Sequence, residues 1–139
     1  HNINAEFVIM DGAFQRCSNL TSVYLGGTFA LHRNGVQYGP FAECYKLEEV
    51  NFGTKLRHIG AFSFQDCIGL KEITLPASLN VSGDVSGLAV APIASTAFQG
   101  CVNITDIYVP GGPDDYYGNR NAPWGATNAT IHYNYGGEN

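Results

Sequence analysis

Residues 64–75 read Phe-Gln-Asp-Cys-Ile-Gly-Leu-Lys-Glu-Ile-Thr-Leu, and this stretch recurs along the chain. Residues 14–25, 41–52 and 98–109 share its frame: Phe, Cys, Leu or Ile, Ile or Val, and a final apolar residue stand at matched positions. Self-similarity of this kind is the sequence signature of a repeat solenoid, in which no single repeat can bury its own apolar face. The chain is therefore predicted to be a stack of short repeats.

The spacing between the repeated phenylalanines gives the length of the unit. The spacings are 27, 23 and 34 residues, so we take 23 residues as the unit and the excess as loop insertions. The insertions are placed at about residues 26–37 and 80–92, because both segments are rich in turn-forming residues and solenoids tolerate extra residues in such loops. Leu56 and Ile59 precede the third copy, and Ile9 precedes the first, so each unit is expected to have a second apolar corner.

Each copy ends in an alternation of apolar and polar residues, which predicts a strand of two to four residues. Such strands are expected to pair in parallel, about 4.8 Å apart, with alternate side chains pointing inward. The Phe-x-x-Cys segment is expected to form a short helical turn on the opposite wall. Its phenylalanines are expected to form one buried ladder, of Phe14, Phe41, Phe64 and Phe98.

The end of the chain carries a less complete copy. Ile131 lies 24 residues beyond Ile107, so residues 130–133 are expected to form a further strand without the preceding Phe and Cys. Trp124, the single tryptophan, is suited to closing the exposed end of a stacked core. Residues 1–139 are thus predicted to form one domain of about five rungs, with a capping rung at about residues 111–135.

The pattern F-x-x-C-x-x-L-x-x-I-x-L-P, together with the ending Pro-Trp-Gly-Ala at residues 123–126, resembles the BspA-like leucine-rich repeats of bacterial surface proteins. The resemblance covers about residues 9–133. Pro76 and Pro110 match the proline that follows the strand, whereas Gly26 and Gly53 depart from it. The resemblance implies a right-handed β/α leucine-rich-repeat solenoid and an extracellular or cell-surface location. It also implies adhesion or binding to host proteins, as in some members.

Composition and hydrophobic patterning argue against nucleic-acid binding, a membrane span and a signal peptide. The net charge is -5 with only 7 Lys and Arg, and the chain has no basic run, so nucleic acid is not an expected partner. No apolar stretch approaches the ~18 residues needed to cross a bilayer. Residues 1–6 lack the charged and apolar regions of a signal peptide.

Four groups of residues resemble chemical sites, but each has a simpler structural explanation. The four cysteines lack a C-x-x-C pair and follow the repeat phase, so buried free thiols are expected instead of a metal site or disulfides. The four histidines occupy different phases, which argues against a metal site. Four Asn-x-Thr/Ser sequons begin at Asn19, Asn80, Asn103 and Asn128, and two of them fall in the repeat frame, where Asn is a turn residue. Asp114 and Asp115 lack a full calcium ligand series, so a solvated loop is the expectation.

No catalytic or cofactor fingerprint occurs, so neither an enzyme nor a cofactor is expected. One alternative is a polysaccharide-cleaving solenoid, because carboxylates on neighbouring rungs would lie about 5 Å apart, near the separation in retaining glycosidases. An open strand face, however, offers no pocket to raise the pKa of one acid. A second alternative is a structural spacer without a ligand of its own.

The leading hypothesis is a binding module that recognises a host or matrix protein, or a glycan, through the outward side chains of its strands. Parallel strands would bring these side chains into register on one surface. Tyrosines add contact area at low entropic cost, and stacked acids favour a basic or cation-bridged partner. The predicted binding residues are Tyr24, Glu49, Asn51, Glu72, Thr74, Asp106, Tyr108 and His132.

Overall fold

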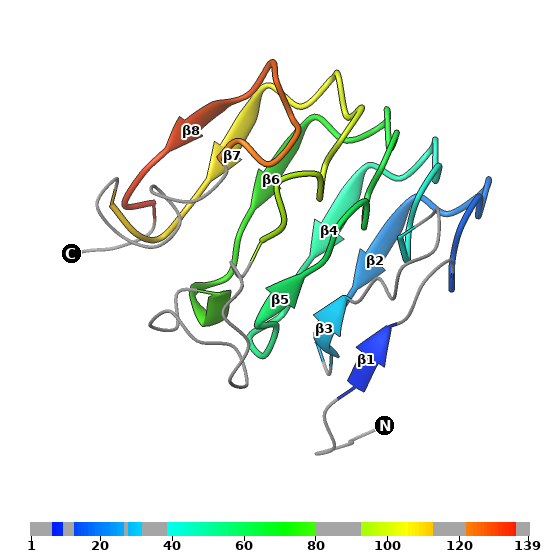
Figure 1. Cartoon of the computed structure of the whole chain (residues 1–139), viewed down its shortest axis with the longest axis horizontal. Coiled ribbons are helices and arrows are strands. Elements are labelled where there is room, and N and C mark those ends of the chain that lie inside the picture. Colours follow the sequence, from blue (N-terminus) through cyan, green and yellow to red (C-terminus); the bar gives the residue numbers. More distant parts are fainter. Residues whose placement is uncertain are drawn as a thin grey trace.

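The computed structural model describes residues 7–9, 13–26, 28–31, 39–79, 93–112 and 122–135. Short strands dominate this part of the chain, and they lie in two rows (Figure 1). The elements are β1 (Phe7–Ile9), β2 (Ser22–Tyr24), β3 (Thr28–Leu31), β4 (Glu49–Asn51), β5 (His58–Ile59), β6 (Glu72–Thr74), the 3-10 helix η1 (Ala77–Leu79), β7 (Asp106–Tyr108) and β8 (Thr130–His132).

The first row contains the five strands that the repeat predicts, and they lie side by side in chain order (Figure 1). β2 pairs in parallel with β4, and β6 pairs in parallel with β7, which pairs with β8. The expectation of uninterrupted pairing is wrong at one place, because β4 and β6 are neighbours but belong to separate hydrogen-bonded ladders. We refer to this place as the ladder break.

Side-chain size gives a physical reason for the ladder break. Phe52 follows β4 at the position that holds Leu25, Leu75 or Val109 in the other copies. Its buried ring packs edge-on against Phe64, with ring centroids 5.9 Å apart. A phenylalanine needs more room than the aliphatic side chains at the equivalent positions, and close-packed interiors absorb extra volume by shifting the backbone.

The second row was not anticipated as a set of strands. β1 pairs in parallel with β3, which pairs in parallel with β5, and an isolated parallel bridge joins Ile59 to Ile93. β3 lies inside the segment expected to be an inserted loop at about residues 26–37, so that expectation is wrong for Thr28–Leu31. The second expected insertion, at about residues 80–92, lies outside the described residues.

The Phe-x-x-Cys segments form hydrogen-bonded turns, and the expectation of short helical turns is wrong. In each copy the cysteine amide donates to the phenylalanine carbonyl three residues earlier, as Cys67 does to Phe64 at 3.2 Å. The residue before the cysteine has a left-handed backbone, for example Asp66 with φ 59° and Gly100 with φ 80°. A right-handed helix cannot continue through such a residue, so the chain turns into the next strand.

The predicted phenylalanine ladder exists, but it is buried only in part. The rings of Phe14, Phe41, Phe64 and Phe98 stack in sequence with centroids 5.1, 5.3 and 5.4 Å apart. Three of these rings are buried, whereas Phe14 is 42% exposed. Among the described residues Phe14 stands at one end of the ladder and stacks on Phe41 alone, so the prediction that it is buried is wrong.

We call the side of the stack that is formed by the Phe-x-x-Cys turns the turn wall. A regular set of hydrogen bonds joins the copies there. Each phenylalanine amide donates to the next copy, as Phe41 does to the Ser63 carbonyl at 2.8 Å. Each following cysteine thiol donates back to the preceding phenylalanine carbonyl: Cys44 to Phe14 at 3.0 Å, Cys67 to Phe41 at 3.1 Å and Cys101 to Phe64 at 2.9 Å. The cysteines therefore combine an apolar packing role with a polar one.

All four cysteines are free, and three of them are buried. Burial raises the pKa of the Cys44 thiol. The neighbouring Cys101 thiol, and then burial, raise the pKa of Cys67. Since the thiolate is the reactive form, these shifts make the central thiols poor nucleophiles.

Candidate functional site

The strand face is the outward surface of β2, β4, β6, β7 and β8. Along these strands the middle residue turns to the core and the two flanking residues turn outward, as the pleat requires. Ser22 lies opposite Glu49, and Tyr24 lies opposite Asn51. In the second ladder Glu72 is in register with Asp106 and Thr130, and Thr74 is in register with Tyr108 and His132.

All eight predicted binding residues lie on this strand face, but the structure divides them into two groups. Tyr24, Glu49, Asn51, Glu72 and Thr74 lie on β2, β4 and β6, on and beside the ladder break, and all five are exposed. Asp106, Tyr108 and His132 form a separate cluster on β7 and β8, where they are half-buried. The acidic row is thus continuous from Glu72 to Asp106 and interrupted between Glu49 and Glu72.

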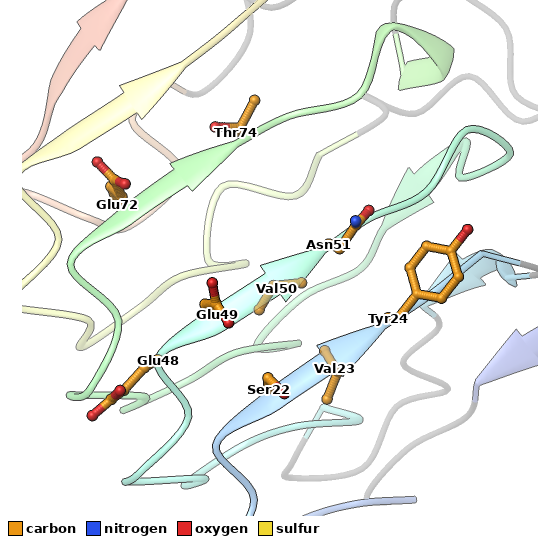
Figure 2. Close-up of a pocket in the computed structure, with 9 residues that line it drawn as sticks. All are labelled: Ser22, Val23, Tyr24, Glu48, Glu49, Val50, Asn51, Glu72 and Thr74. Atoms are coloured by element: carbon orange, nitrogen blue, oxygen red, sulfur yellow. The ribbon is translucent and has the colours of Figure 1, made fainter.

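A groove of about 460 Å³ lies over β2, β4 and β6 (Figure 2). We call it the acidic groove; its lining residues are Ser22, Val23, Tyr24, Glu48, Glu49, Val50, Asn51, Glu72 and Thr74. A second hollow of about 340 Å³ adjoins it and shares Val50, Asn51 and Thr74 with it. Both hollows lie at the ladder break, so the missing pairing between β4 and β6 coincides with the concave part of the strand face.

The acidic groove carries negative charge without a basic residue in its lining. Glu48, Glu49 and Glu72 contribute the charge. In Figure 2 the carboxylates of Glu49 and Glu72 rise from β4 and β6, whereas that of Glu48 points the other way at the start of β4. None of the three forms an ion pair within the described part of the chain. Hydrogen-bonding groups complete the lining, from Ser22, Asn51 and Thr74.

The cluster on β7 and β8 is organised by hydrogen bonds and stacked rings. Asp106 Oδ1 is 2.8 Å from His132 Nε2, and the Thr105 hydroxyl donates to Asp106 Oδ2 at 2.8 Å. These hydrogen bonds, that of His132 first, hold the pKa of Asp106 below its ordinary value. The carboxylate therefore stays ionised at more acidic pH than a free aspartate.

Tyr108 lies between two other rings in this cluster. Its ring stacks on His132 with centroids 4.7 Å apart, and Tyr135 packs on it at 4.6 Å. Burial, and then the negative charges of Asp106 and Glu72, raise the pKa of the Tyr108 hydroxyl. Tyr108 is therefore a neutral hydrogen-bonding group over the usual pH range.

Two residues that the sequence did not predict also belong to these sites. Glu48 lines the acidic groove, and Tyr135 packs against the cluster on β7 and β8. Glu48 precedes β4 by one residue, and the sequence did not show that a groove reaches beyond the strand. Tyr135 follows β8 and reaches Tyr108 through a turn, and the residue is 51% exposed. No periodic signal pointed to Tyr135, because the repeat pattern ends with the strand.

The remaining candidate sites from the sequence have structural roles or lie outside the described residues. The side-chain amides of Asn103 and Asn128 donate to the carbonyls of Ile68 and Val102 in the preceding copy, at 2.8 and 2.9 Å. These sequon nitrogens are thus occupied in joining repeats. Asn80, Asp114, Asp115, His1 and His32 lie outside the described residues. Within the described ranges, no group of three or more His, Cys, Asp or Glu is placed to hold a metal ion.

Comparison with known proteins gives one family and one solved structure. The model of the BspA type leucine rich repeat region matches residues 3–113, in 6 copies. The crystal structure of a leucine rich cell surface protein from Faecalibacterium prausnitzii A2-165 is similar to this chain with a TM-score of 0.58 and 23% identity. The match covers 91% of this chain and 29% of that chain, so this chain spans less than a third of that protein's length. None of the curated proteins matches the chain.

Proposed function

The chain belongs to the BspA-type leucine-rich repeat family, and we propose that it is a non-catalytic binding or adhesion module of a secreted or cell-surface protein. The partner is a host or matrix protein, or a glycan. The description of the similar solved structure as a cell surface protein supports the proposed location. In the described residues, no helix has the length and apolar character required to cross a membrane.

The single observation that carries this proposal is the strand face itself. Five strands present their outward side chains on one side, and the face combines exposed tyrosine, a groove, and carboxylates that form no ion pair with any described residue. Tyr24 is 73% exposed on this face. A large aromatic side chain next to a concave polar surface is a common composition of recognition surfaces.

The proposal extends to the architecture. A right-handed solenoid of about five rungs with a C-terminal cap would present such a face as a continuous recognition surface. The burial of Trp124, which is 1% exposed near the end of the stack, supports the cap.

A catalytic role has less support. A retaining glycosidase needs one carboxylic acid with a raised pKa, and the pKa of Asp106 is lowered. The strand face is open, so water reaches the carboxylates that line it.

The test is a binding screen against extracellular matrix proteins and a glycan array. For each ligand found, Tyr108→Ala and Glu72→Lys are compared with Tyr45→Ala, which removes an exposed tyrosine from the turn wall. We expect both strand-face variants to weaken binding at least about tenfold and the Tyr45 variant to leave it unchanged. A ligand that binds all three variants like the parent would contradict the strand-face site. A chain that binds no matrix protein and no glycan would leave the structural spacer as its role.

A further inference from the structure

Outside the acidic groove, two of the acidic side chains in the described residues have a partner for their charge, and the third, Asp66, has none. Glu43 is paired with Arg16, and Asp106 is hydrogen-bonded by His132 and Thr105. Glu48, Glu49 and Glu72 lack such partners in the described residues, although they share one groove. A cation in the groove would be attracted by these carboxylates.

The ladder break gives these charges a concave site. β4 and β6 are not paired as strands, and here the groove adjoins the second hollow, which is lined by Phe52, Gly53 and Pro76. The second hollow gives a partner's side chain room beside β4 and β6, next to the groove that the three carboxylates line.

The groups around the charges match a peptide. Carboxylates only accept hydrogen bonds, so they suit the donors of lysine and arginine. Asn51 Oδ1 already accepts the Gly53 amide at 2.9 Å, which leaves the Asn51 side-chain N–H groups to donate to a partner's carbonyl. At the rim, the exposed ring of Tyr24 offers a face for a cation or for an aliphatic stem.

We propose that the acidic groove binds a lysine- or arginine-bearing segment of a protein partner. This inference rests on the proposed function and specifies its partner chemistry. A neutral glycan would leave the groove carboxylates without a counter-charge, whereas a basic segment compensates them. Charge complementarity therefore selects a basic protein over a neutral glycan for this part of the strand face.

The experiment measures the binding of a fluorescent glycine-lysine repeat peptide to the chain by fluorescence anisotropy. The reference peptide has glutamine in place of every lysine. Glu49→Gln, Glu72→Gln and the double variant are compared with Asp66→Asn, which removes one negative charge from the turn wall without changing side-chain size. Thermal unfolding by circular dichroism verifies that each substitution leaves the fold intact.

We expect the lysine peptide to bind more tightly than the glutamine peptide, and this preference to fall as salt is added. Each groove variant should weaken binding about threefold and the double variant about tenfold, while Asp66→Asn changes it less than twofold. Equal binding of the two peptides would overturn the proposal. So would an equal loss in Asp66→Asn and Glu72→Gln, because the attraction would then reflect only the net charge.

The peptide experiment and the binding screen can fail independently of each other. A matrix protein or glycan that loses affinity for Tyr108→Ala but not for the double groove variant would support strand-face binding and overturn the basic-segment site. Specific binding of the lysine peptide together with no ligand in the screen would support the groove and count against the proposed adhesion partners.

Discussion

The first and third copies of the repeat have the same pattern and different surroundings. In the third copy Phe64, Cys67 and Leu70 are all 0% exposed. In the first copy the equivalent Phe14 is 42% exposed, and Cys17 and Leu20 are half-buried. Phe64 stacks on a ring of the copy on each side, whereas among the described residues Phe14 stacks on Phe41 alone. The apolar residues of a repeat are thus buried by its neighbours, and the motif alone does not determine their burial.

Truncation of the two phenylalanines should show the largest difference between the copies. Phe64→Ala is expected to lower the free energy of unfolding by about 3 to 5 kcal/mol, because it leaves a cavity between two stacked rings. Phe14→Ala should lower it by only about 1 to 2 kcal/mol, because part of that ring is already in water. Urea unfolding of both variants and the parent measures the two values.

The comparison between the copies fails if the two truncations have equal cost. Equal values would mean that Phe14 is as well covered in solution as Phe64. A Phe64→Ala variant as stable as the parent would show that the stacked register itself is wrong.

The cysteines should show the next difference, in their reactivity. Cys67 is fully buried and its pKa is raised, whereas Cys17 is half-buried. We expect Cys17 to react with an alkylating reagent at least about tenfold faster than Cys67 in the native state. The reagent reaches Cys67 only when the stack opens locally. Mass spectrometry of digested samples taken over time gives both rates.

The same labelling in denaturant is the control. All four thiols should then react at similar rates without added reductant, since the structure holds them free. Fewer than four reactive thiols in denaturant would contradict this.

The asparagines should show the smallest difference. Asn103 donates its side-chain amide to the Ile68 carbonyl of the preceding copy, whereas the equivalent Asn19 has no partner for its amide among the described residues. Asn103→Ala is expected to cost about 1 kcal/mol of stability, and Asn19→Ala less than about 0.5 kcal/mol. Thermal unfolding of the two variants measures the two losses of stability. A larger loss for Asn19→Ala would contradict the assigned roles of the two asparagines.

The repeat pattern predicted the strands of the first row well. The five strands of that row begin and end within a residue of where the alternation of Val23, Val50, Ile73, Ile107 and Ile131 places them. Period-two alternation with one inward residue per strand has few other interpretations. The pattern did not reveal the second row, because β3 lies in a segment without matched positions and β5 has only two residues.

The sequence predicted which residues make up the candidate site, but it did not predict that some of them line a groove. The outward positions are fixed by the pleat, so all eight residues could be placed on one face from the sequence. The ladder break depends on how much room Phe52 takes in a packed core, and this is decided by all the side chains around it. The acidic groove, and with it the role of Glu48, therefore became visible only in the assembled chain.

The sequence by itself determined that the chain is a stack of repeats, which residues turn inward, and that the cysteines follow the repeat instead of pairing as disulfides. These properties are local, since they depend on periodicity and on the chemistry of single side chains. Only the tertiary structure decided how deeply each copy is buried, where the ladder is interrupted, and which outward residues meet as a groove or as the cluster of Asp106, Tyr108, His132 and Tyr135. These properties depend on distances between copies, and a periodic pattern carries no information about where its own regularity is broken.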